Sequence, residues 1–182
     1  VTSTAATATE TSAFDLKYMP QIKANKGNLT VGGAVGSNAG VVSGIVASNL
    51  TFDNFSGYQY LGGIVGSNGT SIRLNADTDY QVKVTDCRFN GTIAEKVNAG
   101  AAGNCYGGIA GINYAELSHN VVTQIRMDIQ GIYTATSTST TAQKEAMASH
   151  AGGIVGKNET NALIDSCMLA DNSKSVLQAK YG

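Results

Sequence analysis

Apolar residues occur along this chain in short blocks interrupted by glycine and asparagine, and the blocks are rich in Val, Ile, Thr and aromatic residues. Blocks of this kind predict β-strands, whereas an amphipathic helix needs a longer run with apolar residues three or four positions apart. The clearest blocks span residues 41–46, 50–55, 80–89, 121–129 and 162–169. The pattern therefore predicts an all-β chain of short strands and tight turns.

One seven-residue motif recurs four times. It reads Gly-Gly, two small or apolar residues, Gly, a variable residue and Asn, and it occupies residues 32–38, 62–68, 107–113 and 152–158. The motif starts are 62 − 32 = 30, 107 − 62 = 45 and 152 − 107 = 45 residues apart. Self-similarity of this kind is the sequence signature of a solenoid. Structural roles are expected for Gly33, Gly36, Asn38, Gly63, Gly66, Asn68, Gly108, Gly111, Asn113, Gly153, Gly156 and Asn158.

Each repeat is expected to form one coil of a right-handed parallel β-helix. Gly-Gly favours a turn, the apolar pair forms a short strand, and Asn tolerates the left-handed conformation where the chain turns again. Four motifs predict about 4–5 coils. Each 45-residue repeat exceeds the 30-residue one by 45 − 30 = 15 residues, which must leave the coil as loops. Such excursions are expected at 75–80, 95–104 and 134–141, with helical turns at 142–148.

Stacked coils place equivalent residues above one another, about 4.8 Å apart. Two apolar columns are predicted, one of Ala34, Ile64, Ile109 and Ile154, the other of Val35, Val65, Ala110 and Val155. Because adjacent strand residues point to opposite faces, one column must be covered by another part of the chain or be exposed. The four motif asparagines predict a third column. We expect it to be a hydrogen-bonded ladder, in preference to a row that binds a polar ligand.

The repeats divide the chain into two parts. Residues 1–30 form a Thr/Ala-rich N-terminal segment with cap or lead-in strands, and residues 31–182 form the β-helix. From Gly152 to Gly182 is 182 − 152 = 30 residues, the same step as between the first two motifs. This spacing predicts that the β-helix continues beyond the C-terminus in a longer protein.

Charge and cysteine content narrow the expected partners. Charged residues make up 14% of the chain, with 12 basic and 13 acidic side chains, so nucleic acid is not expected as a partner. No apolar run reaches the roughly 18 residues of a membrane span, so no membrane insertion is expected.

Cys87, Cys105 and Cys167 lack the CxxC spacing of a metal site. Either Cys87 and Cys105 form a disulfide or all three are buried free thiols, and we favour the free thiols.

Residues 32–182 resemble the GLUG repeat, a Gly-Gly-Leu/Ile-Val-Gly-x-Asn unit followed by a strand with an Asn-Cys-Tyr-like stretch. The four motifs carry the first half of this resemblance. Val84-Thr85-Asp86-Cys87 and Ile164-Asp165-Ser166-Cys167 carry the second half, Leu117-Ser118-His119-Asn120 matches it in part, and the first repeat has no cysteine. The resemblance implies a β-helical scaffold like those of bacterial adhesins and of the stalks of immunoglobulin-A-cleaving metallopeptidases. It implies no catalytic activity, which those peptidases carry in a separate domain.

Candidate catalytic residues are few. A zinc peptidase needs two histidines one helical turn apart with a glutamate between them, and His119 and His150 lie in unrelated contexts. Asp86 and Asp165 hold similar places in their repeats and could line up, as carboxylates do in polysaccharide-cleaving β-helices. No Arg or Lys column accompanies them, which favours solvated strand-end carboxylates. The motif also ends in Asn and not in the Asp of calcium-binding β-rolls, so neither metal nor another cofactor is expected.

The sequence thus predicts an extracellular or cell-surface scaffold, a structural and adhesive stalk or filament segment that is not an enzyme. Its expected partners are proteins, through self-association or flanking domains of the same chain, and surface glycans. A carbohydrate-binding or carbohydrate-cleaving β-helix is the alternative, and it would require a groove of converging carboxylates and basic groups. Asn-x-Ser/Thr triplets, which accept N-glycans in hosts with that pathway, begin at Asn28, Asn49, Asn54, Asn68, Asn90 and Asn158.

Overall fold

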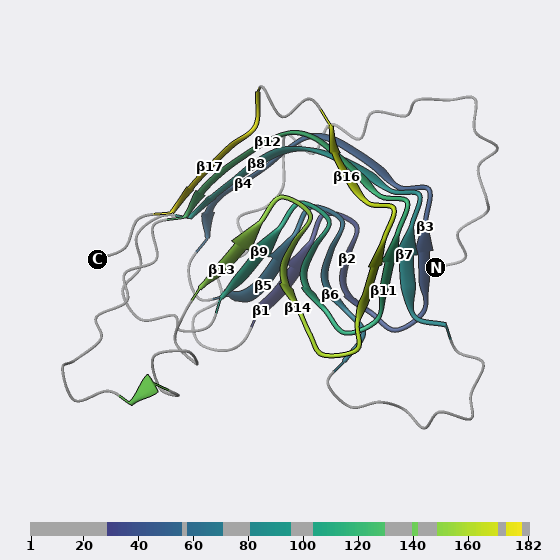
Figure 1. Cartoon of the computed structure of the whole chain (residues 1–182). Coiled ribbons are helices and arrows are strands. Elements are labelled where there is room, and N and C mark those ends of the chain that lie inside the picture. Colours follow the sequence, from purple (N-terminus) through teal and green to yellow (C-terminus); the bar gives the residue numbers. More distant parts are fainter. Residues whose placement is uncertain are drawn as a thin grey trace.

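Each Gly-Gly motif lies at a corner between two short strands, as Figure 1 shows in a computed structural model of the protein. The structure describes residues 29–55, 58–70, 81–95, 104–129, 140–141, 149–170 and 174–179. The expected loops at 75–80 and 134–141 and the expected helical turns at 142–148 lie almost wholly outside these residues. Most of the loop at 95–104 and nearly all of the N-terminal segment also lie outside them.

Four parallel sheets make up the described part of the chain. Sheet A contains β1 (Leu29–Gly32), β5 (Tyr58–Gly62), β9 (Cys105–Gly107) and β13 (His150–Gly152). Sheet B contains β2 (Val35–Asn38), β6 (Val65–Asn68), β10 (Ala110–Asn113) and β14 (Val155–Asn158). Sheet C contains β3 (Val41–Ser43), β7 (Lys83–Thr85), β11 (Glu116–Ser118) and β15 (Leu163–Asp165). Sheet D contains β4 (Val46–Phe55), β8 (Arg88–Glu95), β12 (Val121–Ile129), β16 (Met168–Ala170) and β17 (Val176–Ala179).

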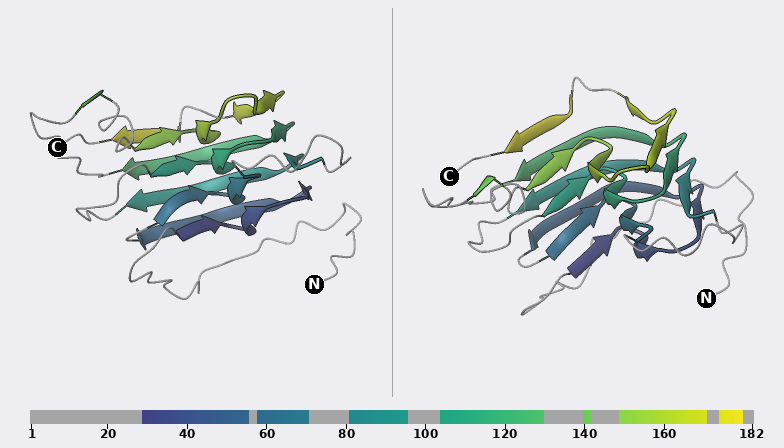
Figure 2. Two further views of the ribbon diagram at one scale, coloured as in Figure 1. Left: turned by 90° about the horizontal axis from the view of Figure 1, so that it is seen from below. Right: turned by 60° about the horizontal axis from the view of Figure 1, so that its bottom comes forward.

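The chain visits sheets A, B, C and D in turn and then begins again, so each repeat contributes one strand to each sheet. We call one such traverse a layer. Layer 1 holds β1–β4, layer 2 β5–β8, layer 3 β9–β12 and layer 4 β13–β16, while β17 pairs with β12. Figure 2 shows these layers stacked in chain order. The predicted all-β class and the parallel stacking of repeats are confirmed, and the arrangement is compatible with a solenoid.

Within a layer, sheets A and B form an inner path, and sheets C and D curve around it (Figure 1). The third glycine of the motif allows the two halves of the inner path to approach closely. A Cβ atom would lie 2.7 Å from the backbone nitrogen of Val31 at Gly66 and 2.5 Å from that of Leu61 at Gly111. Real Cβ atoms essentially never come that near to backbone atoms, so this position requires glycine.

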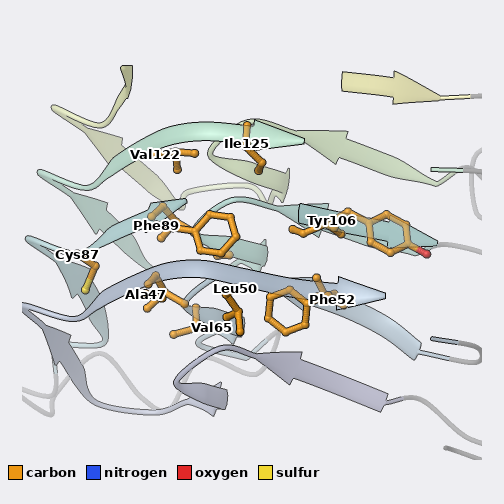
Figure 3. Close-up of a cluster of buried hydrophobic side chains, with 14 of the residues drawn as sticks. Ala47, Leu50, Phe52, Val65, Cys87, Phe89, Tyr106, Val122 and Ile125 are labelled. Atoms are coloured by element: carbon orange, nitrogen blue, oxygen red, sulfur yellow. The ribbon is translucent and has the colours of Figure 1, made fainter. Parts of the chain in front are cut away.

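The core lies between the inner and outer paths, where side chains from all four sheets form one cluster (Figure 3). Both predicted apolar columns belong to it except at Ala34, which is exposed. In layers 2 and 3, Ile64, Val65, Ile109 and Ala110 are fully buried, so both columns are covered there and adjacent residues belong to one cluster. The reason is that the chain bends at the isoleucine. The carbonyl of Ile109 accepts hydrogen bonds from the N–H groups of both Ile64 (3.1 Å) and Val65 (2.9 Å), so strand alternation does not apply there.

A second corner separates sheet C from sheet D, and the sequence pattern did not reveal it. The blocks at 80–89 and 162–169, each predicted as one strand, are in fact the pairs β7 with β8 and β15 with β16. The corner residue has a positive φ in every layer: 69° at Gly44, 55° at Asp86, 54° at His119 and 51° at Ser166. This left-handed conformation ends one strand and redirects the chain into the next.

Replacing His119 by Val tests the importance of this corner. A β-branched residue strongly disfavours positive φ, and we expect the free energy of unfolding to fall by about 1–2 kcal/mol. His119 is exposed, so little packing is lost with its side chain. His119→Gly, the control, should keep or slightly raise the stability, because glycine adopts this conformation without strain. Urea denaturation measures both changes, and equal losses in the two variants would contradict the account.

Candidate functional site

The four motif asparagines form a continuous ladder across the layers. The side-chain amide of Asn38 donates to the Oδ1 atom of Asn68 (2.8 Å), Asn68 donates to Asn113 (2.8 Å), and Asn113 donates to Asn158 (2.7 Å). Asn38, Asn68 and Asn113 are 5% exposed or less. The recurrence of Asn in the motif predicts this ladder, and the register of sheet B places the four residues opposite one another.

The ladder also joins sheet B to sheet C. Three of the Nδ2 atoms also have a backbone acceptor at the start of a sheet C strand: Asn38 donates to the carbonyl of Lys83 (3.1 Å), Asn68 to that of Glu116 (2.9 Å), and Asn113 to that of Leu163 (3.2 Å). The Oδ1 atom of Asn113 also accepts from the N–H of Ala115 (3.2 Å), which fixes the turn between the sheets. These amides satisfy polar backbone groups that would otherwise be unpaired at the corner.

A further buried asparagine, Asn120, occupies the layer-3 place that Cys87 holds in layer 2 and Cys167 in layer 4. Its Oδ1 atom accepts from the N–H of Cys87 (2.9 Å), and its Nδ2 atom donates to the carbonyl of Val84 (2.8 Å) and contacts the sulfur of Cys167 at 3.7 Å. Sequence reasoning gave this residue no role. The partial match of residues 117–120 to the cysteine-containing stretches was the signal that could have found it.

The three cysteines are free thiols, as favoured from the sequence, and Cys87 and Cys105 are buried while Cys167 is partly exposed. Burial raises the pKa of Cys87 above its usual value, although nearby backbone hydrogen bonds oppose the shift. Burial also raises the pKa of the Cys105 thiol from 9.0 to about 11, and Lys157 acts against this rise. Buried thiols with raised pKa values are poor nucleophiles, so the geometry favours packing roles for both residues.

The raised pKa of Cys105 predicts a pH dependence of stability. The neutral thiol is favoured in the fold, so the contribution of this residue is complete below pH 9 and is lost as the pH rises from 9 to about 11. We therefore expect Cys105→Ala to lose less stability across that window than the unchanged chain, when unfolding free energies are compared at pH 8 and pH 10.5. Parallel curves for the two proteins would contradict this assignment.

Polar groups of layers 2, 3 and 4 meet beside sheets A and B. The Nζ atom of Lys157 lies 2.7 Å from Oε1 of Glu159, and this hydrogen bond raises the pKa of Lys157. Burial is the main cause that raises the pKa of Tyr114, and a hydrogen bond with Tyr60 raises it further. Cys105 adds a weaker electrostatic effect to both Tyr114 and Lys157. The groups are paired with one another, which fits a surface network better than a poised acid and base.

The two candidate carboxylates do not line up. Asp165 pairs in sheet C with Ser118, which pairs with Thr85, whereas Asp86 is the corner residue that follows Thr85. The two are therefore one position out of register and two layers apart, which corrects the sequence expectation. Each carboxylate accepts a hydrogen bond from a neighbouring hydroxyl, from Thr85 to Asp86 (2.9 Å) and from Ser166 to Asp165 (3.2 Å). The register therefore does not form the aligned column of carboxylates that the sequence suggested.

The glycan acceptor triplets fall in different environments. Asn68 is fully buried and its amide is used in the ladder, so the folded chain cannot carry a glycan there. Asn49 and Asn158 are exposed, and Asn90 is partly buried and accepts a hydrogen bond from the N–H of Asn49. Asn28 and the side chain of Asn54 lie outside the described residues.

Among the described residues, no three His, Cys, Asp or Glu side chains gather where they could hold a metal ion. His119 is a corner residue, and His150 lies opposite Cys105 in sheet A. The described segments also include no helix with the length and apolar character to cross a membrane. No protein-family model matches the chain, and comparison with curated proteins and with solved structures likewise gave no match.

Proposed function

We propose that this chain is a structural scaffold of the GLUG-repeat kind, a right-handed β-helical stalk or filament segment of about 4–5 coils that works outside the cell or on its surface. Its partners are proteins, and it has no catalysis of its own. The asparagine ladder carries this proposal. The side-chain amides of the motif asparagines, which are among the most buried polar groups of the repeat, bond one coil to the next. They are therefore not available to bind a ligand.

The network around Lys157 and the positions of Asp86 and Asp165 support the same conclusion. Lys157 is neutralised by Glu159, and the two aspartates are out of register. A carbohydrate-cleaving enzyme needs a carboxylate pair on one face, with a separation suited to the glycosidic bond. The polar groups described instead bond to near neighbours within the stack.

Incubation with a panel of polysaccharides tests the proposal against its rival. The scaffold account predicts neither new reducing ends nor unsaturated products, and equal behaviour of the unchanged chain and of the Asp86→Asn and Asp165→Asn variants. An activity that either substitution abolishes, while the circular dichroism spectrum is unchanged, would overturn the scaffold function. Glycan arrays test for binding without cleavage. If the unchanged chain bound one class of glycan and the Asp86→Asn or Asp165→Asn variant did not, a lectin-like role would be favoured.

A further inference from the structure

The chain contains two Asn-Gly pairs, Asn68-Gly69 and Asn90-Gly91, and the first of them is part of the asparagine ladder. None of the other three motif asparagines is followed by glycine. The side chain of an asparagine is open to attack by the backbone nitrogen of the next residue, and glycine hinders this attack least because it has no Cβ atom. Asn68 is therefore the ladder residue with the highest intrinsic tendency to deamidate.

The stacked layers hold both reacting groups of this pair. The N–H of Gly69 donates to the carbonyl of Asn38 in layer 1 (2.9 Å). The Oδ1 atom of Asn68 accepts from the side chain of Asn38 (2.8 Å). Its Nδ2 atom donates to Asn113 (2.8 Å) and to the carbonyl of Glu116 (2.9 Å). Asn68 is fully buried and Gly69 is buried beside it, so the fold keeps from this N–H the base that must remove its proton.

We propose that Asn68-Gly69 is a deamidation site that the stacked layers protect and that makes prolonged unfolding of this chain irreversible. In the unfolded chain, the backbone nitrogen of Gly69 loses its proton and forms a bond to Cγ of Asn68. The bond from Cγ to Nδ2 breaks, and the amide leaves as ammonia with that proton. Water then opens the succinimide ring at one of its two carbonyl groups, which gives aspartate or isoaspartate. This inference goes beyond the scaffold function and does not depend on it.

Either product breaks the ladder in its middle. A carboxylate only accepts hydrogen bonds, so it cannot donate to Asn113 or to the carbonyl of Glu116 as the amide of Asn68 does. It also places a negative charge among oxygen atoms at a fully buried position. Isoaspartate adds an atom to the main chain where the register of Asn68 with Asn38 and Asn113 must be kept. A chain modified at this position should therefore not regain the stacked layers.

The second pair, Asn90-Gly91, provides a comparison within the same chain. Asn90 is partly exposed in sheet D, and its Oδ1 atom accepts from the N–H of Asn49. An aspartate at position 90 keeps an oxygen that can accept this hydrogen bond. The two pairs share the same intrinsic chemistry, so a difference in how their products refold reflects their places in the fold.

The first experiment ages the unfolded chain and identifies which modified molecules refold. The protein is kept in guanidinium chloride at pH 8, the denaturant is then diluted, and the native fraction is isolated by size-exclusion chromatography. Peptide mass spectrometry should find deamidation at both pairs in the aged pool. We expect the native fraction to retain aspartate at position 90 and to be depleted at least about tenfold in both products at position 68. Equal proportions of modified Asn68 in the native fraction and in the aged pool would overturn the proposal.

Incubation of the folded chain measures the protection. We expect Asn68 to deamidate at least about a hundredfold more slowly in the folded chain than in guanidinium chloride, because attack on its side chain requires the ladder to open. Similar rates in the two states would show that the stack does not protect this pair, and the proposal would fail.

A variant without the Asn-Gly pair tests whether this site limits recovery of the fold. Gly69 has a φ of 80°, which asparagine tolerates, so Gly69→Asn hinders the attack and keeps the backbone conformation. Its Cβ atom would lie 3.3 Å from those of Tyr114 and Ala115, so each aged sample is compared with unaged protein of the same variant. Recovery after ageing should fall more slowly for Gly69→Asn than for the unchanged chain. The control Asn90→Gln should age like the unchanged chain, and equal losses in all three proteins would assign the irreversibility to another residue.

Discussion

Replacing Gly107 by Ala should destabilise the fold more than any other single substitution considered for this chain. A Cβ atom at Gly107 would lie 1.9 Å from the carbonyl oxygen of Ala110 and 2.8 Å from the backbone nitrogen of Gly156. Ala110 belongs to the same layer as Gly107 and Gly156 to layer 4, and both contacts are with backbone atoms, so no side-chain rotation relieves the clash. We expect a loss above about 4 kcal/mol, a large part of the roughly 5–15 kcal/mol that stabilises a domain.

Gly40→Ala provides the matched control. A Cβ atom at Gly40 would have no other atom within 4 Å, so this substitution should change the free energy of unfolding by less than about 0.5 kcal/mol. Guanidinium denaturation, followed by circular dichroism, measures both variants. Similar stabilities for Gly107→Ala and Gly40→Ala would show that the Gly-Gly corner is not as tightly packed as described.

Replacing Asn113 by Ala should cost about 3 kcal/mol or more, because the fully buried Asn68 and several backbone groups lose a hydrogen bond at once. The amide of Asn68 loses its acceptor, and the carbonyl of Leu163 and the N–H of Ala115 lose their partners. The loss should increase the rate of unfolding, since the ladder forms only when the layers have stacked.

Asn158→Ala is the control for the ladder. Asn158 is exposed at the end of the ladder and donates to Ala162. Its removal also takes one acceptor from the amide of Asn113, which keeps the carbonyls of Ala115 and Leu163, so the substitution should cost no more than about 1 kcal/mol. A loss at Asn113 as small as that at Asn158 would mean that water replaces the ladder readily. The proposed scaffold would then lack its main polar connection between layers.

The motif predicted the inner path because the same residues return in every layer. A hydrogen-bonded ladder needs an asparagine at the same place in successive layers, as at Asn68 and Asn113. The recurrence of asparagine in the motif therefore predicted the ladder. Only glycine fits where Gly66 and Gly111 approach backbone atoms, so the third position of the motif also kept one residue type. Recurrence of one residue type was therefore the physical signature of both features.

The outer path could not be read from the sequence in the same way. Its corner needs only a residue that tolerates positive φ, and Gly44, Asp86, His119 and Ser166 meet that need with four residue types. Because the corner was not recognised, Asp86 and Asp165 were predicted to be equivalent. Asp86 is the corner residue itself, whereas Asp165 is the residue before the corner. Aligning the quartets on Cys87 and Cys167 would have shown that Asp86 corresponds to Ser166. Asn120 was missed because it replaces the cysteine in a single layer.

Single-molecule stretching of the chain between two handle domains tests the scaffold most directly. A stack held by the ladder should resist extension and then lengthen in steps of one layer, about 100–150 Å for the 30- and 45-residue repeats. The Asn113→Ala variant should unfold at a clearly lower force, and Asn158→Ala should not. Smooth extension at low force, unchanged by either substitution, would contradict a structural role for the stack.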